Sequence, residues 1–352
     1  MKVIQMADLQ TTYISDLAQG SIQDSTLFIT DDGINTNSAT AADVANFAKE
    51  KILPEANSYA DTKKNEAVEE SKEYTNGVIS NKNLLINSNF KDPINYVGFT
   101  SIKANGSSQR IIPVWQYFSN NAGNSCQLTE NGLQLIQPEA ASGRIYQYFE
   151  NFKELAGKTV TLSGEVEIVN SFTVYINADG SYINKGTYTN NGKFTCTFTF
   201  PDTITTSLFI MLQSNATANN NMTVKWLKLE YGNIATPFIP PNKALELLKC
   251  ERYIFVLPND SSYIASTSGA ATTAYMIVPL PTEMRTIPTI IGSAMNIRGA
   301  GKPNTAVSGV AIYKKYSNAI ILQLTMPTGF EANNVYFVYT REQIVFDSNI
   351  YT

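Results

Sequence analysis

The sequence predicts a mainly β protein in four parts: a small N-terminal segment (residues 1–52), a short helical stalk (53–82), an antiparallel β-sandwich (83–241) and a C-terminal β-rich head (242–352). Three observations predict this class. Short segments alternate between apolar and polar residues, clusters of Asn, Asp and Gly separate them, and a proline-rich stretch divides two such regions.

The N-terminal segment and the stalk differ in pattern. We expect a strand at residues 26–30, a turn at 31–33, and a helix that starts in 38–43 and carries Val44 and Phe47 on one side. The polar residues that follow predict a stalk helix of roughly 35 to 40 Å. Its heptad-like seam has few large apolar residues and consists of Ala60, Lys64, Ala67, Ser71, Tyr74 and Val78. It predicts a thin coiled coil, and a solitary solvated helix is the alternative.

The sandwich is predicted from its period-2 alternation. Residues 159–168 and 193–200 each place apolar side chains on one side and Thr, Ser, Glu or Lys on the other. Further strands are predicted at 172–176, 208–213 and 223–229, and we assign Trp226 to the core. Many short strands with such turns favour an antiparallel, jelly-roll-like sandwich.

The junction and the head complete the chain. Three prolines within residues 237–241 cannot continue a ladder, and Asn242 is a candidate N-cap for a helix that buries Ala244, Leu247 and Leu248. A loop is expected at residues 299–304. The strands predicted in the head are 274–280, 287–291, 307–313, 319–326, 335–339 and 343–346.

Four short motifs occur in an order that resembles bacteriophage tail fibres and receptor-binding proteins. They are NLLINSNF (83–90), LAGKTVTLSGEV (155–166), LEYGNIATPFIPP followed by LELLKCERY (229–253), and IVPLPTEMRTIPTI (277–290). The resemblance spans roughly residues 83–352. It implies a carbohydrate-module-like sandwich and a homotrimeric adhesin of the virion, made in the host cytoplasm, that binds a bacterial surface polysaccharide. It also implies that residues 1–52 dock onto phage baseplate or tail proteins, the alternative being a unit that touches only its own trimer.

Composition excludes several functions. The net charge of −4 and the 16% of charged residues provide no basic surface for nucleic acid. No apolar run is long enough to insert into a membrane, and the N-terminus lacks a signal-peptide pattern. The chain has no histidine, which excludes Ser-His-Asp triads, Cys-His pairs and His-ligated zinc. We expect no cofactor, no metal and no catalytic residues.

Two sets of residues carry less specific signals. Cys126, Cys196 and Cys250 are far apart and odd in number, so they are interpreted as structural thiols. Glu165 and Glu167 share one face of a strand at about 7 Å, near the separation of an inverting glycosidase pair. Alternating Thr and Glu on a solvated strand face explain them without any chemistry, and this is the preferred interpretation.

Flat apolar rings with polar groups suit the recognition of neutral, hydrated sugars. The candidate ligand-binding residues are Trp115, Tyr117, Tyr175, Tyr182, Tyr188, Arg285 and Tyr313. Tyr263, Tyr316 and Lys314 are candidates of the same kind. For each aromatic residue, packing in the core or at a trimer interface is the alternative. Arg285 could bind an acidic polymer such as a teichoic acid, or it could hold a turn or a trimer seam.

These observations predict a non-catalytic protein that attaches a virion to a cell-surface glycan through several weak sites at once. Two alternatives remain open. One is a tail-associated depolymerase that cuts the glycan with carboxylates, and the other is a purely structural baseplate or tail component.

Overall fold

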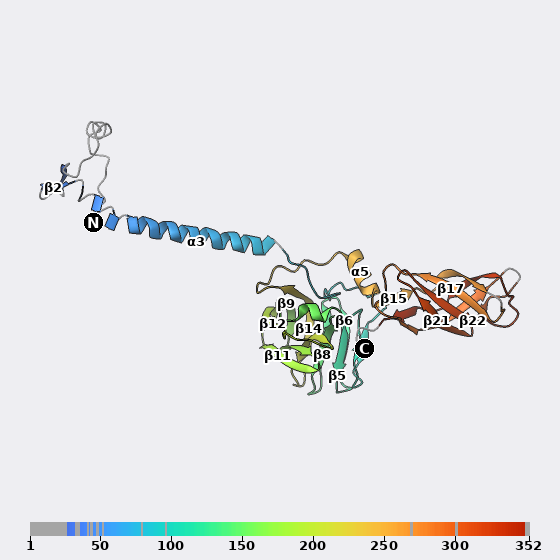
Figure 1. Cartoon of the computed structure of the whole chain (residues 1–352). Helices are drawn as coiled ribbons and strands as arrows, with labels where there is room; N and C mark the ends of the chain where they lie inside the picture. The colour runs from blue at the N-terminus through green and yellow to red at the C-terminus, as the bar shows by residue number, and fades with distance from the viewer. Residues whose placement is uncertain are drawn as a thin grey trace, which may run out of the picture. The chain divides into compact units, whose positions relative to one another are not determined.

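The computed structural model describes residues 27–31, 36–40, 42, 45–46, 49–50, 53–78, 80–95, 97–267, 270–299 and 302–348. The chain forms two compact units, residues 1–77 and 78–352, and each is described by itself. Figure 1 shows the elements along the chain.

The first unit contains a hairpin in which β1 (Leu27–Asp31) pairs with β2 (Thr36–Thr40) in antiparallel register. The predicted strand at 26–30 is therefore confirmed. The prediction that a helix starts in residues 38–43 is wrong for residues 38–40, which form part of β2. Their pairing with β1 overrides the helix-capping signal of these small residues. Val44, Phe47 and most of the turn predicted at 31–33 lie outside the described residues.

The helix α3 (Leu53–Val78) confirms the predicted stalk helix, with 26 residues and therefore a length of roughly 39 Å. Every side chain described along it, from residue 53 to 71, is exposed. These include Leu53, Tyr59 and Val68. Its assembly into a coiled coil stays a prediction.

The second unit begins with the predicted antiparallel sandwich, which consists of two six-stranded sheets. The first sheet has the order β11-β10-β13-β8-β5-β4. Its strands are β4 (Gln109–Arg110), β5 (Gln116–Ser119), β8 (Gly143–Tyr148), β10 (Phe172–Ala178), β11 (Ser181–Tyr188) and β13 (Leu208–Ser214). The second has the order β12-β9-β14-β7-β6-β3. Its strands are β3 (Ser101–Lys103), β6 (Ser125–Thr129), β7 (Gly132–Ile136), β9 (Thr159–Ile168), β12 (Gly192–Thr199) and β14 (Met222–Tyr231).

One continuous core lies between these sheets. Val160, Leu162 and Val166 of β9 are fully buried there, as their alternation predicted. The polar side of β9 is less exposed than predicted, because Thr161 and Ser163 are also buried. A short helix, α4 (Phe152–Leu155), follows β8.

Trp226 corrects the prediction that placed it in the core. The register of β14 against β9 shifts between Val224 and Trp226, and this irregularity leaves the indole half-buried on the outer side. There it stacks on Phe238 with ring centroids 4.6 Å apart, and its Nε1 donates to the Glu165 carboxylate at 3.2 Å.

The junction helix α5 (Lys243–Glu251) confirms Asn242 as N-cap, since its Oδ1 accepts from the backbone N–H groups of Ala244 and Leu245. The prediction of which side of α5 is buried is wrong. Ala244 and Leu248 are exposed, whereas Glu246 and Cys250 are buried. The carboxylate of Glu246 accepts from the backbone N–H of Asn87 at 2.5 Å, so a polar contact with the sandwich orients the helix.

The head contains a three-stranded sheet, β15-β24-β18, and a curled seven-stranded sheet, β20-β19-β23-β16-β17-β22-β21. The first consists of β15 (Ile254–Leu257), β18 (Thr289–Ile291) and β24 (Ile344–Asp347). The second consists of β16 (Ser262–Thr267), β17 (Thr273–Pro279), β19 (Met295–Arg298), β20 (Thr305–Ala306), β21 (Gly309–Lys315), β22 (Ala319–Thr325) and β23 (Val335–Thr340). All six predicted head strands are present with shifted ends, and β15, β16, β19 and β20 are additional. Within the expected loop at 299–304, residues 300–301 lie outside the described residues.

Candidate functional site

The strongest candidate site is on the outer face of the sheet β11-β10-β13-β8-β5-β4. In β8, Ile145 points into the main core, while Tyr146 belongs to a separate apolar cluster with Phe209 and Met211 of β13. The register explains the cluster, because Tyr146 lies opposite Met211 and Tyr148 lies opposite Phe209. The sheet therefore has a second apolar surface on the side away from the core.

Aromatic rings contact one another across this surface. The Phe209 ring centroid lies 4.7 Å from that of Tyr148, 5.2 Å from that of Tyr146 and 5.9 Å from that of Tyr182. These rings border a cavity of about 150 Å³. We call its lining the aromatic face, and it consists of Ser108, Phe118, Arg144, Tyr146, Tyr148, Tyr182, Phe209 and Met211.

The turn between β10 and β11 positions Tyr182. Asp179 and Gly180 have positive φ values of 52° and 86°, as a tight hairpin turn requires. The Asp179 carboxylate accepts hydrogen bonds from the backbone N–H groups of Thr205, Thr206 and Ser207, and these hold its pKa well below the usual range. The hairpin is thereby fixed to the neighbouring loop, and Tyr182 lies opposite Asn177 on the outer side of the sheet.

Two tyrosine hydroxyls of the aromatic face, those of Tyr146 and Tyr148, stay protonated at neutral pH. Burial raises the pKa of Tyr146 to about 12, and burial also raises the pKa of Tyr148. The Tyr146 hydroxyl donates to Ser108 Oγ. Tyr148 is half-buried and Tyr182 is 55% exposed, so both rings present surface to solvent. The face thus combines ring surfaces with neutral hydroxyl groups.

The predicted site residues of the sandwich separate into two groups. Tyr182 lines the aromatic face, and Tyr175 packs against its buried cluster. Tyr188 is on the inner side, where it stacks on Phe172 at 5.3 Å and donates to the Thr195 carbonyl. Trp115 and Tyr117 are fully buried, so the structure places them in the core, which was the alternative interpretation. Their Gly/Ser/Asn-rich neighbourhood indicated a surface loop, but both residues face the inter-sheet core.

The candidates in the head lie apart from the aromatic face. Tyr313 is 59% exposed and contacts Tyr275 at 4.9 Å beside a cavity of about 700 Å³, which Tyr263 also lines. Lys314 lies 4.9 Å from the Tyr316 ring. Arg285 is half-buried at the junction, where its backbone N–H donates to the Arg252 carbonyl and its charge helps to lower the pKa of Glu150. This position fits the interpretation in which Arg285 holds a turn.

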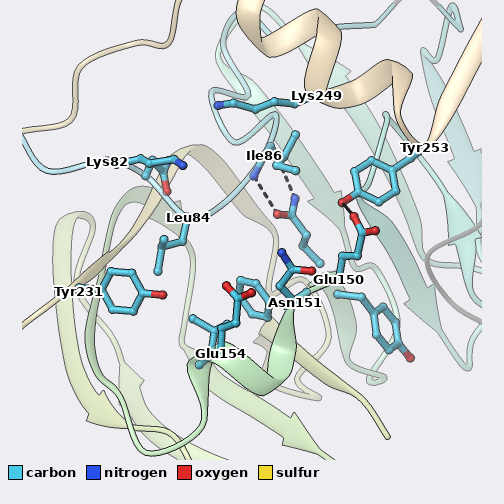
Figure 2. A pocket seen from close by; sticks show the side chains of 14 residues that line it. Lys82, Leu84, Ile86, Glu150, Asn151, Glu154, Tyr231, Lys249 and Tyr253 are labelled. Atoms are coloured by element: carbon cyan, nitrogen blue, oxygen red, sulfur yellow. Dashed lines mark hydrogen bonds between the residues drawn. The ribbon is translucent and has the colours of Figure 1, made fainter. Parts of the chain in front are cut away.

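A second cavity of about 440 Å³ lies between the sandwich and α5, and Figure 2 shows its side chains. Tyr148 lines it as well as the aromatic face. Figure 2 shows Glu150 directed at the Tyr253 hydroxyl, which donates to it at 2.8 Å. Arg252 donates hydrogen bonds to both oxygens of the Glu150 carboxylate. These hydrogen bonds are the largest cause of the lowered pKa of Glu150. A general acid in glycoside cleavage needs a raised pKa, so Glu150 is a structural anchor here.

Glu165 and Glu167 are held in a similar way. The ammonium group of Lys225 lies 2.8 Å from a Glu165 carboxylate oxygen and 2.9 Å from one of Glu167. Its hydrogen bond is the largest cause that lowers the pKa of Glu165. Glu165 therefore lacks the raised pKa of a glycosidase acid, and the ion pairs of both carboxylates with Lys225 fit the interpretation of a strand face.

Of the residues that line the aromatic face, only Tyr182 was predicted from the sequence as a site residue. The unnoticed signal was Gly143–Tyr148, where Arg144, Tyr146 and Tyr148 alternate with Ile145 and Gln147. Ile145 and Gln147 are buried on one side of this strand, and the rings of Tyr146 and Tyr148 lie on the other. An aromatic stripe opposite a core-facing stripe indicates a sheet that presents rings on its outer face.

The described residues contain no cluster of acidic or cysteine side chains that could hold a metal ion. Cys126, Cys196 and Cys250 are buried and free, and burial raises the pKa of each thiol. Among the helices that the structure describes, none is long and apolar enough to cross a membrane.

No family model matches the chain, and no curated protein matches it. Among solved structures, one described as "CBM4 structure and function" has 15% identity over 42% of this chain and 98% of its own, with a TM-score of 0.30. The CBM22-1 xylan-binding domain of Paenibacillus barcinonensis Xyn10C has 12% identity over 46% of this chain and 100% of its own, with a TM-score of 0.25. A structure described as a receptor binding domain has 9% identity over 72% of this chain and 90% of its own, with a TM-score of 0.17. The chain is thus distantly similar to carbohydrate-binding modules and to a receptor-binding domain. These scores carry no argument about function.

Proposed function

We propose that this protein binds a carbohydrate without cleaving it, and that the aromatic face of the sandwich is the binding site. The observation that carries the proposal is a set of contacting rings on the outer side of a sheet whose inner side already forms the core. A strand face that only needed solubility would be polar. Rings kept on the outer side indicate a ligand with flat apolar surfaces.

The chemistry of the face suits a sugar. Exposed ring surface of Tyr148 and Tyr182 can stack on the C–H face of a pyranose, and a neutral tyrosine hydroxyl can donate to or accept from its hydroxyl groups. Amide side chains lie on the same side of the sheet, since Gln116 is opposite Tyr146 and Gln213 is opposite Arg144. A cavity of about 150 Å³ holds part of one sugar ring, so one site binds weakly. Several copies are then needed for firm attachment.

We propose further that the protein is a homotrimeric receptor-binding protein of a phage tail, which attaches the virion to a bacterial surface polysaccharide and docks to tail proteins through residues 1–52. The resemblance of four motifs supports this role. The exposed helix α3 supports the assembly, because an isolated helix with polar side chains is marginal in water and needs partner helices. A structural tail component or a depolymerase would not need the aromatic face for attachment.

The test is the binding of the purified full chain to polysaccharide extracted from candidate host cells, measured by affinity electrophoresis. Tyr182→Ala removes an exposed ring from the aromatic face and should weaken binding about fivefold or more, because a stacked ring is worth on the order of 1 kcal/mol. Tyr231→Ala is the matched control. Tyr231 is 48% exposed and lines the other cavity, so binding should be unchanged.

Equal loss in both variants, or loss only in Tyr231→Ala, would contradict the assignment of the site. Release of reducing ends during incubation would favour the depolymerase. Absence of binding to every host polysaccharide would favour the structural component.

A further inference from the structure

Arg144 is the cation of the aromatic face. Its side chain has no hydrogen bond or ion pair among the described residues. Its guanidinium carbon lies 4.9 Å from the centre of the Phe118 ring. Its Nε is buried and has no hydrogen-bond partner. A guanidinium group offers five donors in a fixed plane, and burying donors without acceptors is unfavourable.

Two other arginines of the same unit each bind a carboxylate of the chain. Arg252 forms two hydrogen bonds with the Glu150 carboxylate, and Arg110 pairs with Asp347. Arg144 has no such carboxylate within reach, although it lies on the same sheet as Arg110. The difference indicates that its acceptor is supplied from outside the chain.

The surroundings of Arg144 favour an anion. None of the eight residues that line the aromatic face is acidic, and Arg144 is the one charged residue among them. The residue opposite Arg144 on β13 is Gln213, and the residue opposite it on β5 is Phe118, and both are uncharged. Tyr146, Phe209 and Met211, which line the cavity with Arg144, are buried, and an apolar surface of this kind strengthens the field of a neighbouring charge.

We propose that the aromatic face selects saccharides that carry an anionic group, a carboxylate or a phosphodiester, and that Arg144 binds this group. This inference rests on the proposed function and adds the class of ligand. The sugar ring stacks on the exposed tyrosine rings while the anion accepts a planar pair of N–H groups from Arg144. The bound anion satisfies the donors that the folded chain leaves open.

The experiment compares three soluble polymers on the full chain by isothermal titration calorimetry: polygalacturonate, poly(glycerol phosphate) and neutral dextran. The expected result is binding of at least one anionic polymer about tenfold or more tighter than dextran, with affinity that falls as salt rises. Arg144→Gln should abolish this preference. Arg144→Lys should restore only part of it, because a lysine keeps the charge but loses the planar pair of donors. The two anionic polymers distinguish a carboxylate from a phosphodiester ligand.

Arg341→Gln is the matched control, since Arg341 is an exposed arginine of the head and the variant has the same change in net charge. Thermal unfolding of each variant confirms that the fold is retained. If the wild type binds dextran as tightly as the anionic polymers, or if Arg144→Gln and Arg341→Gln behave alike, the selectivity of Arg144 is overturned. In that case the proposed function stands if Tyr182→Ala still weakens binding. If no polymer binds, neither the anionic ligand nor the proposed function is supported.

Discussion

The sheet β11-β10-β13-β8-β5-β4 of the sandwich and the seven-stranded sheet of the head each have an outer face with apolar side chains, but these faces are built differently. On the aromatic face of the sandwich, Tyr146, Phe209 and Met211 are buried against one another, and a single cation lies beside them. On the outer face of the seven-stranded head sheet, Ile264, Ile277 and Phe337 are 62%, 62% and 53% exposed.

The outer face of the head extends over neighbouring strands. Ile264 lies opposite Phe337, and Ile277 lies opposite Ile321. None of the described outward positions on the central strands β23, β16, β17 and β22 is charged. A broad apolar surface without charge is typical of a protein interface, whereas a small aromatic cavity with one cation is typical of a ligand site. The head face therefore suits the interface of the proposed trimer, and the aromatic face suits the proposed ligand site.

The largest expected effect comes from placing charge on the head face. Ile264→Asp combined with Ile277→Asp should convert the proposed trimer into a monomer of 38.7 kDa, because two carboxylates per chain cannot be desolvated in an apolar interface. Light scattering measures the mass. Val169→Asp combined with Ile287→Asp places the same charge on residues that are 69% and 70% exposed elsewhere, and should leave the trimer intact. A trimer that survives the first double variant would show that the head face does not hold the subunits together.

A smaller effect is expected when the aromatic face loses its central ring. Phe209→Ala removes a buried ring that contacts Tyr146, Tyr148 and Tyr182, and should lower the free energy of unfolding by about 3 kcal/mol. Urea denaturation measures the change. Phe337→Ala on the exposed head face should change the stability of the monomer by less than about 0.5 kcal/mol. Equal effects of the two variants would remove the distinction between the faces.

The smallest effect concerns the contact between the sandwich and the head through Glu150 and Arg252. The folded state lowers the pKa of Glu150, so its contribution to stability is present above the ordinary carboxyl pKa and is lost as pH falls through the lowered value. Glu150→Gln should therefore destabilise the protein by about 1 kcal/mol at pH 7, a value that takes partial solvent exposure into account. The difference between variant and wild type should shrink below about pH 4. A difference that stays constant down to pH 2 would show that packing, and not charge, is lost in the variant.

The sequence predicts the sheets better than it predicts the site. Period-2 alternation in β9 and β12 identified the core-facing side, because burial of one face is a local property of the pattern. The strands of the head that were not predicted, β15, β16, β19 and β20, are short or are defined by long-range pairing, which no local pattern specifies. The helix start predicted in residues 38–43 was wrong over 38–40 for the same reason, since β1 pairs with those residues.

The aromatic face could not be derived by composition alone. Trp115 and Tyr182 both occur near Gly- and Asn-rich segments, but only the sheet topology shows that one faces the core and the other faces outward. The contact between Tyr148 and Phe209 joins residues 61 positions apart in sequence, and their strands become neighbours only in the folded sheet. Trp226 turned outward because of a register shift that its strand pattern does not encode.

The most direct test of the central claim is a crystal structure of the full chain with a bound oligosaccharide from the polymer that binds best in solution. If the aromatic face is the binding site, we expect a sugar ring stacked within about 4 Å of the Tyr148 or Tyr182 ring, with its anionic group bound to Arg144. A sugar bound instead beside Tyr313 on the head, or in the cavity of Figure 2 away from Tyr148, would contradict the assignment of the binding site to the aromatic face.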